Sequence, residues 1–476
     1  MPLSLLSYFP FDPTPDQARL FELLRGFLLA DTAGDRPTFL LTGYAGTGKT
    51  SVVSALVQAL PALGYDCVLL APTGRAAKVL AGYAARPAHT IHKHIYRQSG
   101  LGDAGGGPAF QLLPNRARHT VYVVDEASMI SDEAGFGERG LLGDLLAFVF
   151  GAGGTRPDNR LLLIGDPAQL PPVGQTRSAA LDPDILRGRF RCSLTETTLR
   201  QVMRQAEESG ILANATALRD ELSIEKPNPK LRTKGAHGVW AMSGERLEDG
   251  LRYAYDKFGV EGTTVICRSN KQANLYNQLI RRVIFDAEDE LQGGDYLMIA
   301  RNNYHWLPAG HEMGFLANGD FAEVRRVRRT EELHGFRFVD VRLRFIDYPN
   351  APELDVKLLL DSLHAEAPSL PAADAQRLFQ AVQADYADLS SKAKRLEAMR
   401  ADPYFNALQV KFAYALTCHK AQGGQWGAVF LDHGYLKPEV GFDQEFIRWL
   451  YTALTRAERE LYLLNFKPEL LAGDQG

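Results

Sequence analysis

Cysteine is scarce in this sequence, with four residues in 476. None forms a C-x-x-C pair and no cysteine cluster is apparent, so an iron–sulfur site is not predicted, and the thiols are interpreted as buried and reduced. No apolar stretch approaches the roughly 20 residues that cross a bilayer. Met1 to Pro10 is apolar but lacks the basic region and cleavage site of a signal peptide. We expect a cytoplasmic protein without membrane contact.

The sequence also lacks an excess of basic charge, because 53 Lys and Arg residues stand against 57 Asp and Glu residues. The net charge of −4 does not exclude nucleic-acid binding, since binding needs a local basic groove rather than a basic total. Two local clusters exist, Arg325 to Arg329 and the pair Arg281-Arg282. A solvated face is the commoner role of such clusters, and a binding surface is the alternative.

The chain length of 476 residues predicts about two to four domains. From Phe39 to Ile164, short apolar runs alternate with helical stretches and end in polar loops. This pattern is typical of parallel strands covered on both faces, with the chemistry at their carboxyl ends. The runs are Cys67–Leu70, Val121–Val124 and Leu161–Ile164. A second α/β set is indicated by the runs Thr264–Cys267, Phe412–Ala415, Val429–Leu431 and Leu461–Leu464.

Other segments interrupt these α/β patterns. Between Thr90 and Thr120, two strand-like stretches flank a Gly-rich centre, Gly100 to Gly107, which favours a β-hairpin or a surface loop. From Ile284 to Asn350 the chain is strand-like, and its alternation slips phase near Val339-Asp340. We interpret this segment as a small β-barrel or sheet. Ala372 to Ala401 is helical and highly charged, as in a projecting helical pair or a packed amphipathic helix.

Gly43 to Thr50 spell G-x-x-x-x-G-K-T directly after the apolar run Phe39 to Leu41 and before a helix from Ser51 to Leu60. A buried strand, a Gly-rich loop and a helix N-terminus together build a phosphate cradle, because backbone N–H groups converge there. The lysine of such a loop contacts the β/γ oxygens and its threonine binds Mg²⁺. The predicted nucleotide-binding residues of this loop are Gly43, Ala45, Gly46, Thr47, Gly48, Lys49 and Thr50.

Acidic and amide side chains follow two further strands. Asp125 and Glu126 close the run that ends at Val124, where Asp125 would hold Mg²⁺ and Glu126 would deprotonate the attacking water. Gln169 follows the run that ends at Ile164 and is placed to sense a γ-phosphate. The sequence therefore predicts a protein that binds and hydrolyses a nucleoside triphosphate.

These motifs, in this order, resemble those of the superfamily 1 helicases over almost the whole chain. Thr14-Pro15-Asp16-Gln17 resembles the motif whose glutamine contacts adenine, which adds Gln17 to the nucleotide site. Arg204 in Val202-Met203-Arg204-Gln205 resembles the arginine that is given to the γ-phosphate, with Arg200 as the second candidate. Two more segments, Ala71–Ala77 and Thr90–Lys93, resemble the loops with which this family grips single-stranded DNA. The last two motifs of the family are matched by Thr417–Gly423 and Tyr451–Arg456.

The resemblance implies an α/β fold with two RecA-like parallel-sheet motor domains. An inserted β-hairpin, an inserted SH3-like β-domain and a helical projection would complete it. The implied boundaries are 1–200 for the first motor domain with a hairpin insertion at 94–117, 201–283 and 408–476 for the second, and 284–407 for the inserted β-domain.

The resemblance also implies residue roles. The implied catalytic residues are Lys49, Asp125, Glu126, Gln169, Arg204 and Arg456, with Thr50 and Asp125 as metal ligands. The implied DNA-binding residues are Thr73, Arg75, His92, Lys93, Phe110, Thr417, His419 and Lys420. Two more aromatic residues, Tyr96 and Trp426, would either stack on bases or belong to the core.

The wording H-K-A-Q-G at His419 to Gly423 is similar to the RecD, Dda and Pif branch, which moves 5′→3′. The expected function is therefore an ATP-dependent 5′→3′ DNA helicase that uses ATP and Mg²⁺ and acts on single-stranded DNA and duplex junctions. One alternative is an ATP-switched clamp that grips single strands without unwinding, and another is an RNA helicase of the same superfamily. No nuclease motif is apparent, and the cellular pathway and protein partners stay open.

Overall fold

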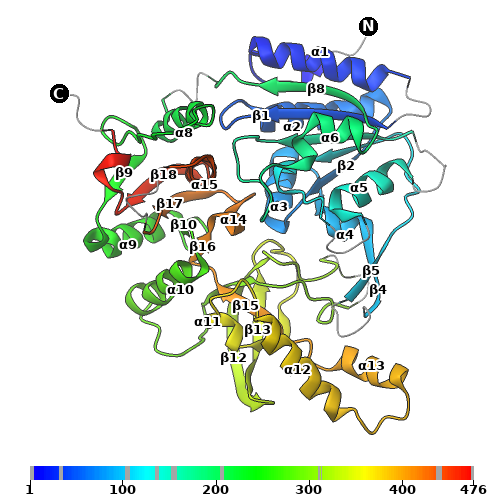
Figure 1. The fold of residues 1–476 in the computed structure, drawn as a ribbon, viewed down its shortest axis with the longest axis vertical. Helices are drawn as coiled ribbons and strands as arrows, with labels where there is room; N and C mark the ends of the chain where they lie inside the picture. The colour runs from blue at the N-terminus through cyan, green and yellow to red at the C-terminus, as the bar shows by residue number, and fades with distance from the viewer. Residues whose placement is uncertain are drawn as a thin grey trace.

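The computed structural model describes residues 5–31, 36–101, 108–133, 139–151, 158–203, 208–308, 311, 313–435 and 442–472. These residues form two parallel sheets and a closed barrel, as Figure 1 shows. The two sheets lie side by side, and the barrel lies below them in this view. Within these ranges, no helix combines the length and the apolar character needed to cross a membrane. The α/β class predicted from the sequence is confirmed.

The first sheet has the strand order β3-β2-β6-β7-β1-β8, and each neighbouring pair is parallel. The predicted apolar runs are confirmed as strands. Because all six strands run the same way, the polar loops after them meet at one edge of the sheet. The strands are β1 (Pro37–Gly43), β2 (Asp66–Ala71), β3 (Ala88–Thr90), β6 (Thr120–Val124), β7 (Arg160–Gly165) and β8 (Ser193–Leu199).

Threonine caps fix where several helices of this unit begin. Thr14 and Gln17 form a reciprocal capping box at the start of α1. The hydroxyls of Thr73 and Thr90 accept the N–H groups of Ala76 and Lys93, which starts α3 and α4. The helices are α1 (Pro15–Leu29), α2 (Lys49–Ala59), α3 (Gly74–Ala84), α4 (Ile91–Ile95), α5 (Gly140–Phe150) and α6 (Pro183–Gly188).

The second sheet has the order β16-β10-β17-β18-β9 and is also parallel between all neighbours. Its strands are β9 (Val239–Met242), β10 (Thr263–Cys267), β16 (Ala415–Thr417), β17 (Trp426–Asp432) and β18 (Ala457–Leu464). The helices around it are α8 (Gly210–Glu221), α9 (Leu247–Phe258), α10 (Asn270–Leu279), α14 (Cys418–Ala421) and α15 (Gln444–Leu454).

A closed barrel is formed by β11 (Tyr296–Ile299), β12 (Phe321–Leu333), β13 (Phe336–Phe345), β14 (Leu354–Leu359) and β15 (Leu408–Phe412). The phase slip predicted near Val339 is confirmed, because Phe338 and Val339 are both buried in β13. The pairing of β12 with β13 shifts register twice on the facing strand, after Val324 and after Val327. Such irregularities bend a strand as barrel closure requires.

The predicted single strand over Phe412 to Ala415 is wrong. Phe412 ends β15 in the barrel, whereas Ala415 begins β16 in the second sheet. The turn between them is buried, and the Tyr414 hydroxyl accepts the N–H of Tyr296 at 3.0 Å. In a continuous apolar run, the residue types do not indicate where one strand ends or which sheet the next strand joins. The barrel therefore extends beyond the 284–407 segment predicted for it.

The arginines of the Arg325–Arg329 cluster face carboxylates on the outside of the barrel. Their ion pairs are Arg325 with Glu323 and Glu353, Arg328 with Asp355, and Arg329 with Glu331. Exposed pairs of this kind stabilise little, on the order of 0–1 kcal/mol each. The pairing favours the solvated-face interpretation of this cluster.

The charged segment predicted as helical forms α12 (Ala372–Asp385) and α13 (Lys392–Ala401). Leu378, Val382 and Met399 of these helices are buried in one cluster with Phe336 and Phe338 of the barrel. The helices therefore pack on the barrel through an apolar side, and Figure 1 shows them at its lower edge. This arrangement supports the packed amphipathic alternative.

The stretches between Thr90 and Thr120 form an antiparallel pair, β4 (Tyr96–Leu101) and β5 (Pro108–Leu112). The hairpin alternative thus fits the described strands, while most of the predicted tip, residues 102–107, lies outside the described residues. The Phe110 ring of β5 lies 5.0 Å from the ring of Tyr304, in the loop after β11. The hairpin therefore contacts the barrel unit.

Arg281 joins the second sheet's helical layer to the barrel. It lies in the π-helical turn Ile280–Ile284, and its guanidinium donates to both carboxylate oxygens of Asp295 at 2.7 and 2.8 Å. Both residues are buried, so removing one leaves an uncompensated charge.

We expect Arg281→Leu to lower the unfolding free energy by roughly 3–5 kcal/mol in chemical denaturation. The matched control Arg326→Leu, at an exposed position, should change it by less than about 0.5 kcal/mol; equal losses would contradict the assignment.

Candidate nucleotide site and nucleic-acid cleft

The Gly-rich loop after β1 has the backbone that a phosphate cradle requires. Gly46 and Gly48 adopt φ values of +76° and +81°, which side-chain-bearing residues rarely tolerate. The Lys49 ammonium donates to the carbonyls of Gly43 and Tyr44 at 2.6 and 2.9 Å. These carbonyls hold the lysine over its own loop, where a triphosphate would replace them as its partner. Thr50 is exposed in the first turn of α2.

Gln17 is attached to the same loop. Its side-chain nitrogen donates to the Thr47 carbonyl at 3.1 Å, and its side-chain oxygen accepts from the N–H of Thr14. A Cβ placed on Gly48 would lie 2.6 Å from the Gln17 side-chain nitrogen, so only glycine fits there. The predicted adenine-contacting residue is therefore buried against the phosphate loop.

Asp125 and Glu126 follow β6 at the same edge of the sheet. The Asp125 carboxylate accepts the Glu126 N–H at 2.8 Å and the Tyr83 hydroxyl at 2.5 Å. Glu126 has a φ of +52°, a strained value for this residue type that occurs at functional sites. Burial raises the pKa of Glu126, and the neighbouring Arg456 opposes that rise. A carboxylate with a raised pKa suits a general base.

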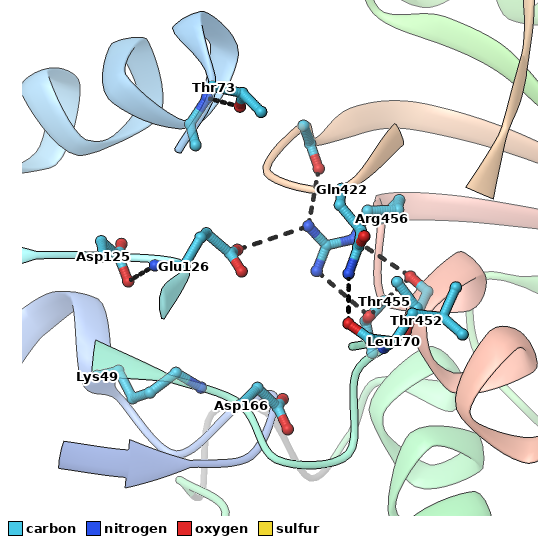
Figure 2. A network of polar contacts seen from close by, with 12 residues as sticks. Lys49, Thr73, Asp125, Glu126, Asp166, Leu170, Gln422, Thr452, Thr455 and Arg456 are labelled. Atoms are coloured by element: carbon cyan, nitrogen blue, oxygen red, sulfur yellow. Dashed lines mark hydrogen bonds and ion pairs between the residues drawn. The ribbon is translucent and has the colours of Figure 1, made fainter. Parts of the chain in front are cut away.

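Arg456 reaches this carboxylate from the second sheet. One of its terminal nitrogens lies 3.7 Å from a Glu126 oxygen, and Figure 2 shows the guanidinium pointing toward Glu126. Its Nε donates to the Thr452 carbonyl at 3.2 Å, which fixes its direction. With the Gln169 amide oriented to satisfy both neighbours, its nitrogen donates to Glu126 and its oxygen accepts from Arg456, each at 3.2 Å. Three predicted catalytic residues thus meet between the two sheets.

The second predicted arginine, Arg204, lies outside the described residues. The alternative, Arg200, is exposed at the end of β8, and its backbone N–H donates to Asp16 at 3.0 Å.

A magnesium ion would find oxygen donors beside the phosphate loop. The Thr50 hydroxyl and the Asp125 carboxylate are hard donors of the kind that Mg²⁺ prefers. The described ranges hold no cluster of three or more His, Cys, Asp or Glu residues that could bind a metal ion alone. The donor set therefore fits a metal ion that shares its coordination with phosphate oxygens and water.

A cleft of about 720 Å³ lies between the two sheets and the barrel. The first sheet's side contributes Thr73 from the loop after β2, Arg75 from α3 and His92 from α4, and α14 contributes His419 and Lys420. Five of the eight predicted DNA-binding residues thus line one cavity. Lys93, Phe110 and Thr417 are not among its lining residues.

Two of the predicted DNA contacts are engaged within the protein. The Arg75 guanidinium lies 4.2 Å above the Trp426 ring and 4.8 Å from the Phe321 ring. The Lys93 ammonium donates to the Tyr348 hydroxyl at 2.9 Å and lies 3.8 Å from the Asp320 carboxylate. In this arrangement both cations connect the first sheet's loops to other parts of the molecule.

The aromatic alternatives are decided in favour of the core. Trp426 is 2 % exposed, and Tyr96 is 9 % exposed with its hydroxyl donating to Asp144 at 2.7 Å. The base-stacking reading of these two residues is therefore wrong, because neither ring presents a free face. The physical reason is packing: the Trp426 ring is covered by the Arg75 guanidinium, and the Tyr96 ring belongs to the core cluster of the first unit.

Burial weakens the positive charge of the cleft. It lowers the pKa of His92 to about 4, so this imidazole is neutral at pH 7. It also lowers the pKa of Lys420 to about 8, and the Lys420 ammonium donates to Asn318 at 2.5 Å. Binding of a polyanion here would favour the charged form of Lys420.

Several lining residues come from the barrel and carry no recognisable motif. They are Arg301, Asn302, Tyr304, Phe315, Asn318 and Phe321. The polar triplet Arg301-Asn302-Asn303 directly after the buried strand β11 is the signal that could have indicated them. A strand-end loop of this kind commonly carries binding residues.

The comparisons with known proteins agree with this geometry. Residues 28–228 match a family model described as an AAA domain, and residues 412–464 match one described as a UvrD-like helicase C-terminal domain. The first matched segment contains the whole first sheet and Glu126, and the second contains β16, β17 and β18 of the second sheet together with Arg456. Both matched segments carry motifs that resemble those of the superfamily 1 helicases of the RecD and Dda type.

Two relatives show the extent of the similarity. The chain is 34% identical over 191 residues to the ATP-dependent RecD2 DNA helicase of Deinococcus radiodurans, covering 40% of this chain and 23% of that protein. It is 26% identical over 274 residues to the ATP-dependent DNA helicase dda of Enterobacteria phage T4, covering 54% of this chain and 55% of that protein. The matches therefore span about a quarter to half of the relatives' own length.

A crystal structure of the Pif1 helicase from Bacteroides, in complex with ADP-AlF3 and ssDNA, superposes with a TM-score of 0.48 and 15% identity. The superposition covers 98% of this chain and 95% of that chain.

Asp320 generates a pH prediction for the contact between barrel and cleft. Burial raises its pKa from the ordinary 3.8 to about 6, so the folded protein binds this proton more tightly than the unfolded chain. Protonation of Asp320 therefore stabilises the folded state at low pH, and this stabilisation is lost as the pH rises toward and through 6. Between pH 8 and pH 5, the unfolding free energy of the wild type should gain about 1 kcal/mol relative to Asp320→Asn. Denaturant titrations at both pH values measure this gain, and an unchanged difference would contradict it.

Proposed function

We propose that the protein is an ATP-dependent 5′→3′ DNA helicase that tracks single-stranded DNA and unwinds duplex. The observation that carries this proposal is the cluster of Glu126, Gln169 and Arg456, which joins the two parallel sheets at their facing edges. Because the base lies beside one sheet and the cation beside the other, hydrolysis would depend on the two sheets approaching each other. Coupling of closure to hydrolysis is what a translocating motor needs.

The phosphate loop would bind ATP with Mg²⁺. Lys49 would leave the carbonyls of its own loop to contact the triphosphate, and Gln17 would contact adenine from the side of Thr47. Thr50 and Asp125 would hold the metal ion, which would neutralise charge on the phosphates. Glu126 would take the proton of the attacking water, since burial raises its pKa.

Arg456 would stabilise the charge that develops on the transferred phosphoryl group. Arg456 is 5 % exposed, and its guanidinium is already directed toward the base by its bond to the Thr452 carbonyl. A preorganised cation in a water-poor site stabilises a transition state without reorganisation. Arg204 stays a proposed second cation on the strength of its motif alone.

Single-stranded DNA would lie in the cleft of about 720 Å³ between the sheets and the barrel. Thr73 and His92 from one sheet and His419 and Lys420 from the other line it, so opening and closing would alternate the grip. Tyr304 offers an aromatic surface for bases along the barrel side. Arg75 and Lys93 would join the DNA site only by leaving their present partners.

The insertions would act on the duplex ahead of the motor. The β4–β5 hairpin would serve as a pin that splits the strands, and its Phe110 contact with Tyr304 supports a fixed position for it. The closed barrel, with α12 and α13 packed on it, would be the SH3-like domain. The two sheets would correspond to RecA-like motor domains at 1–200 and at 201–283 with 408–476.

The DNA substrate and the polarity rest on the relatives and on the wording of one motif. The relatives named above are described as DNA helicases, and H-K-A-Q-G at His419 to Gly423 is the form of the 5′→3′ branch. An RNA helicase of the same superfamily is the second candidate. ATPase stimulation by DNA and RNA strands of one sequence separates them, and stronger stimulation by RNA would favour the second.

A tailed duplex tests the proposal most directly. The wild type should unwind a duplex with a 5′ single-stranded tail and leave one with a 3′ tail intact, because translocation starts on the tail. Lys49→Ala should abolish both ATP turnover and unwinding, since the loop loses its triphosphate contact. Strand separation on native gels and phosphate release measure the two activities. Unwinding of the 3′-tailed substrate alone would refute the polarity, and unwinding of neither would favour the clamp.

The pin generates a separate prediction. Replacing residues 102–107 by a two-residue turn should reduce unwinding at least about tenfold while DNA-stimulated ATPase stays within about twofold, because tracking and strand splitting would be separate functions. The matched control is Phe110→Leu, which keeps an apolar side chain beside Tyr304 and should have a smaller effect on unwinding. Full unwinding by the shortened hairpin would exclude it as the pin.

A further inference from the structure

The middle of the phosphate loop is contacted from the second sheet's side. The Tyr44 ring lies 4.7 Å from the guanidinium of Arg219 on α8. The Ala45 N–H donates to the Tyr451 hydroxyl on α15 at 2.8 Å. These contacts bring the loop that would hold the triphosphate into direct touch with two helices of the other half of the molecule.

The Tyr451 hydroxyl joins three segments at one point. It accepts the N–H of Ala45 and donates to the Asp166 carboxylate at 2.7 Å. Tyr451 and Asp166 are 1 % and 2 % exposed, so both bonds lie in a region without solvent competition. Burial raises the pKa of Tyr451 well above its ordinary value, and the hydroxyl keeps the proton that it donates. The phosphate loop, the loop after β7 and helix α15 therefore share one hydroxyl.

Helix α15 holds the loop after β7 along one face. Arg448 donates to the carbonyls of Pro167 and Gln169, and the Thr452 hydroxyl accepts the N–H of Leu170 at 2.8 Å. Arg448, Tyr451 and Thr452 are spaced three and four residues apart, which places them on the same side of a helix. A shift of α15 would therefore move Gln169, and with it the amide that bridges Glu126 and Arg456.

We propose that Tyr451 is a positioning residue that couples occupancy of the phosphate loop to the seating of α15, through its bonds to Ala45 and Asp166. A phosphate binds such a loop through its backbone N–H groups, and the Ala45 N–H is taken by Tyr451 when Lys49 lies over its own loop. An arriving triphosphate competes with the hydroxyl for this N–H. The released hydroxyl keeps its hydrogen bond to Asp166, and a shift of α15 then changes the position of the loop that carries Gln169. This inference rests on the proposed motor function and deepens it.

The test compares Tyr451→Phe with the wild type in the full chain. The variant keeps the ring and loses only the hydroxyl, so the competitor for the Ala45 N–H is gone. We expect the dissociation constant for ADP and the KM for ATP to fall by roughly two- to tenfold, the span of one hydrogen bond. We also expect the kcat measured with single-stranded DNA to fall by a similar factor, because the signal to Gln169 is lost. A joint fall of KM and kcat is the signature of lost ground-state strain.

The matched control is Tyr462→Phe. The Tyr462 hydroxyl also donates to a buried carboxylate, that of Glu460 at 2.7 Å, but it lies in β18 and does not touch the phosphate loop. Its loss should leave the ADP dissociation constant and the KM for ATP unchanged. The same changes in both variants would mean a general structural effect and would overturn the proposal, as would an unchanged ADP affinity in Tyr451→Phe.

A second variant covers the case in which Tyr451→Phe fails to fold. Asp166→Asn keeps the shape of the partner and weakens its bond to the hydroxyl, so it should shift the same two quantities less and in the same direction. The double variant should equal Tyr451→Phe alone, and additive effects would overturn the coupling through Asp166. The ADP titration needs no nucleic acid. A wild type without DNA-stimulated ATPase would therefore refute the proposed function, while the titration still decides the role of Tyr451.

Discussion

The contact between α15 and the loop after β7 holds the candidate site together. Leu170 binds the Thr452 hydroxyl through its N–H and the Gln422 amide through its carbonyl, at 2.8 and 2.9 Å. These bonds bring the edges of two separate sheets close enough for Arg456 to approach Glu126. Without the arginine, Glu126 would be a buried carboxylate with no nearby compensating cation from the second sheet, which is costly. The chemistry of the site thus depends on the relative position of the two parallel-sheet units.

The barrel is a third partner in this seating rather than a separate appendage. The Lys93 ammonium is paired with the Asp320 carboxylate and donates to the Tyr348 hydroxyl, both on the barrel side. The Arg75 guanidinium lies over the rings of Phe321 in the barrel and Trp426 in the second sheet. The loops expected to grip single-stranded DNA are therefore bonded to the walls of the cleft that would receive it. Nucleic acid would have to exchange with these internal partners, so the affinity for DNA and the stability of this closed arrangement are linked.

Local features were predictable wherever neighbouring residues carry the whole signal. The phosphate loop, the Asp125-Glu126 pair and the alternating apolar runs belong to this class, because strand, turn and helix start are encoded within about ten residues. The phase slip near Val339 was predictable for the same reason. The run Phe412 to Ala415 was misassigned because both candidate sheets accept the same apolar residues.

The sequence by itself determined the class of fold, the motif order and the chemical types available at the strand ends. Only the tertiary structure decided which of those groups meet: Arg456 with Glu126, Tyr451 with Ala45, and Lys93 with the barrel rather than with solvent. It also decided that Trp426 and Tyr96 are core residues. The physical reason is that these contacts join residues tens to hundreds of positions apart, and their energies depend on distance, burial and partner geometry, which residue type and local spacing do not specify.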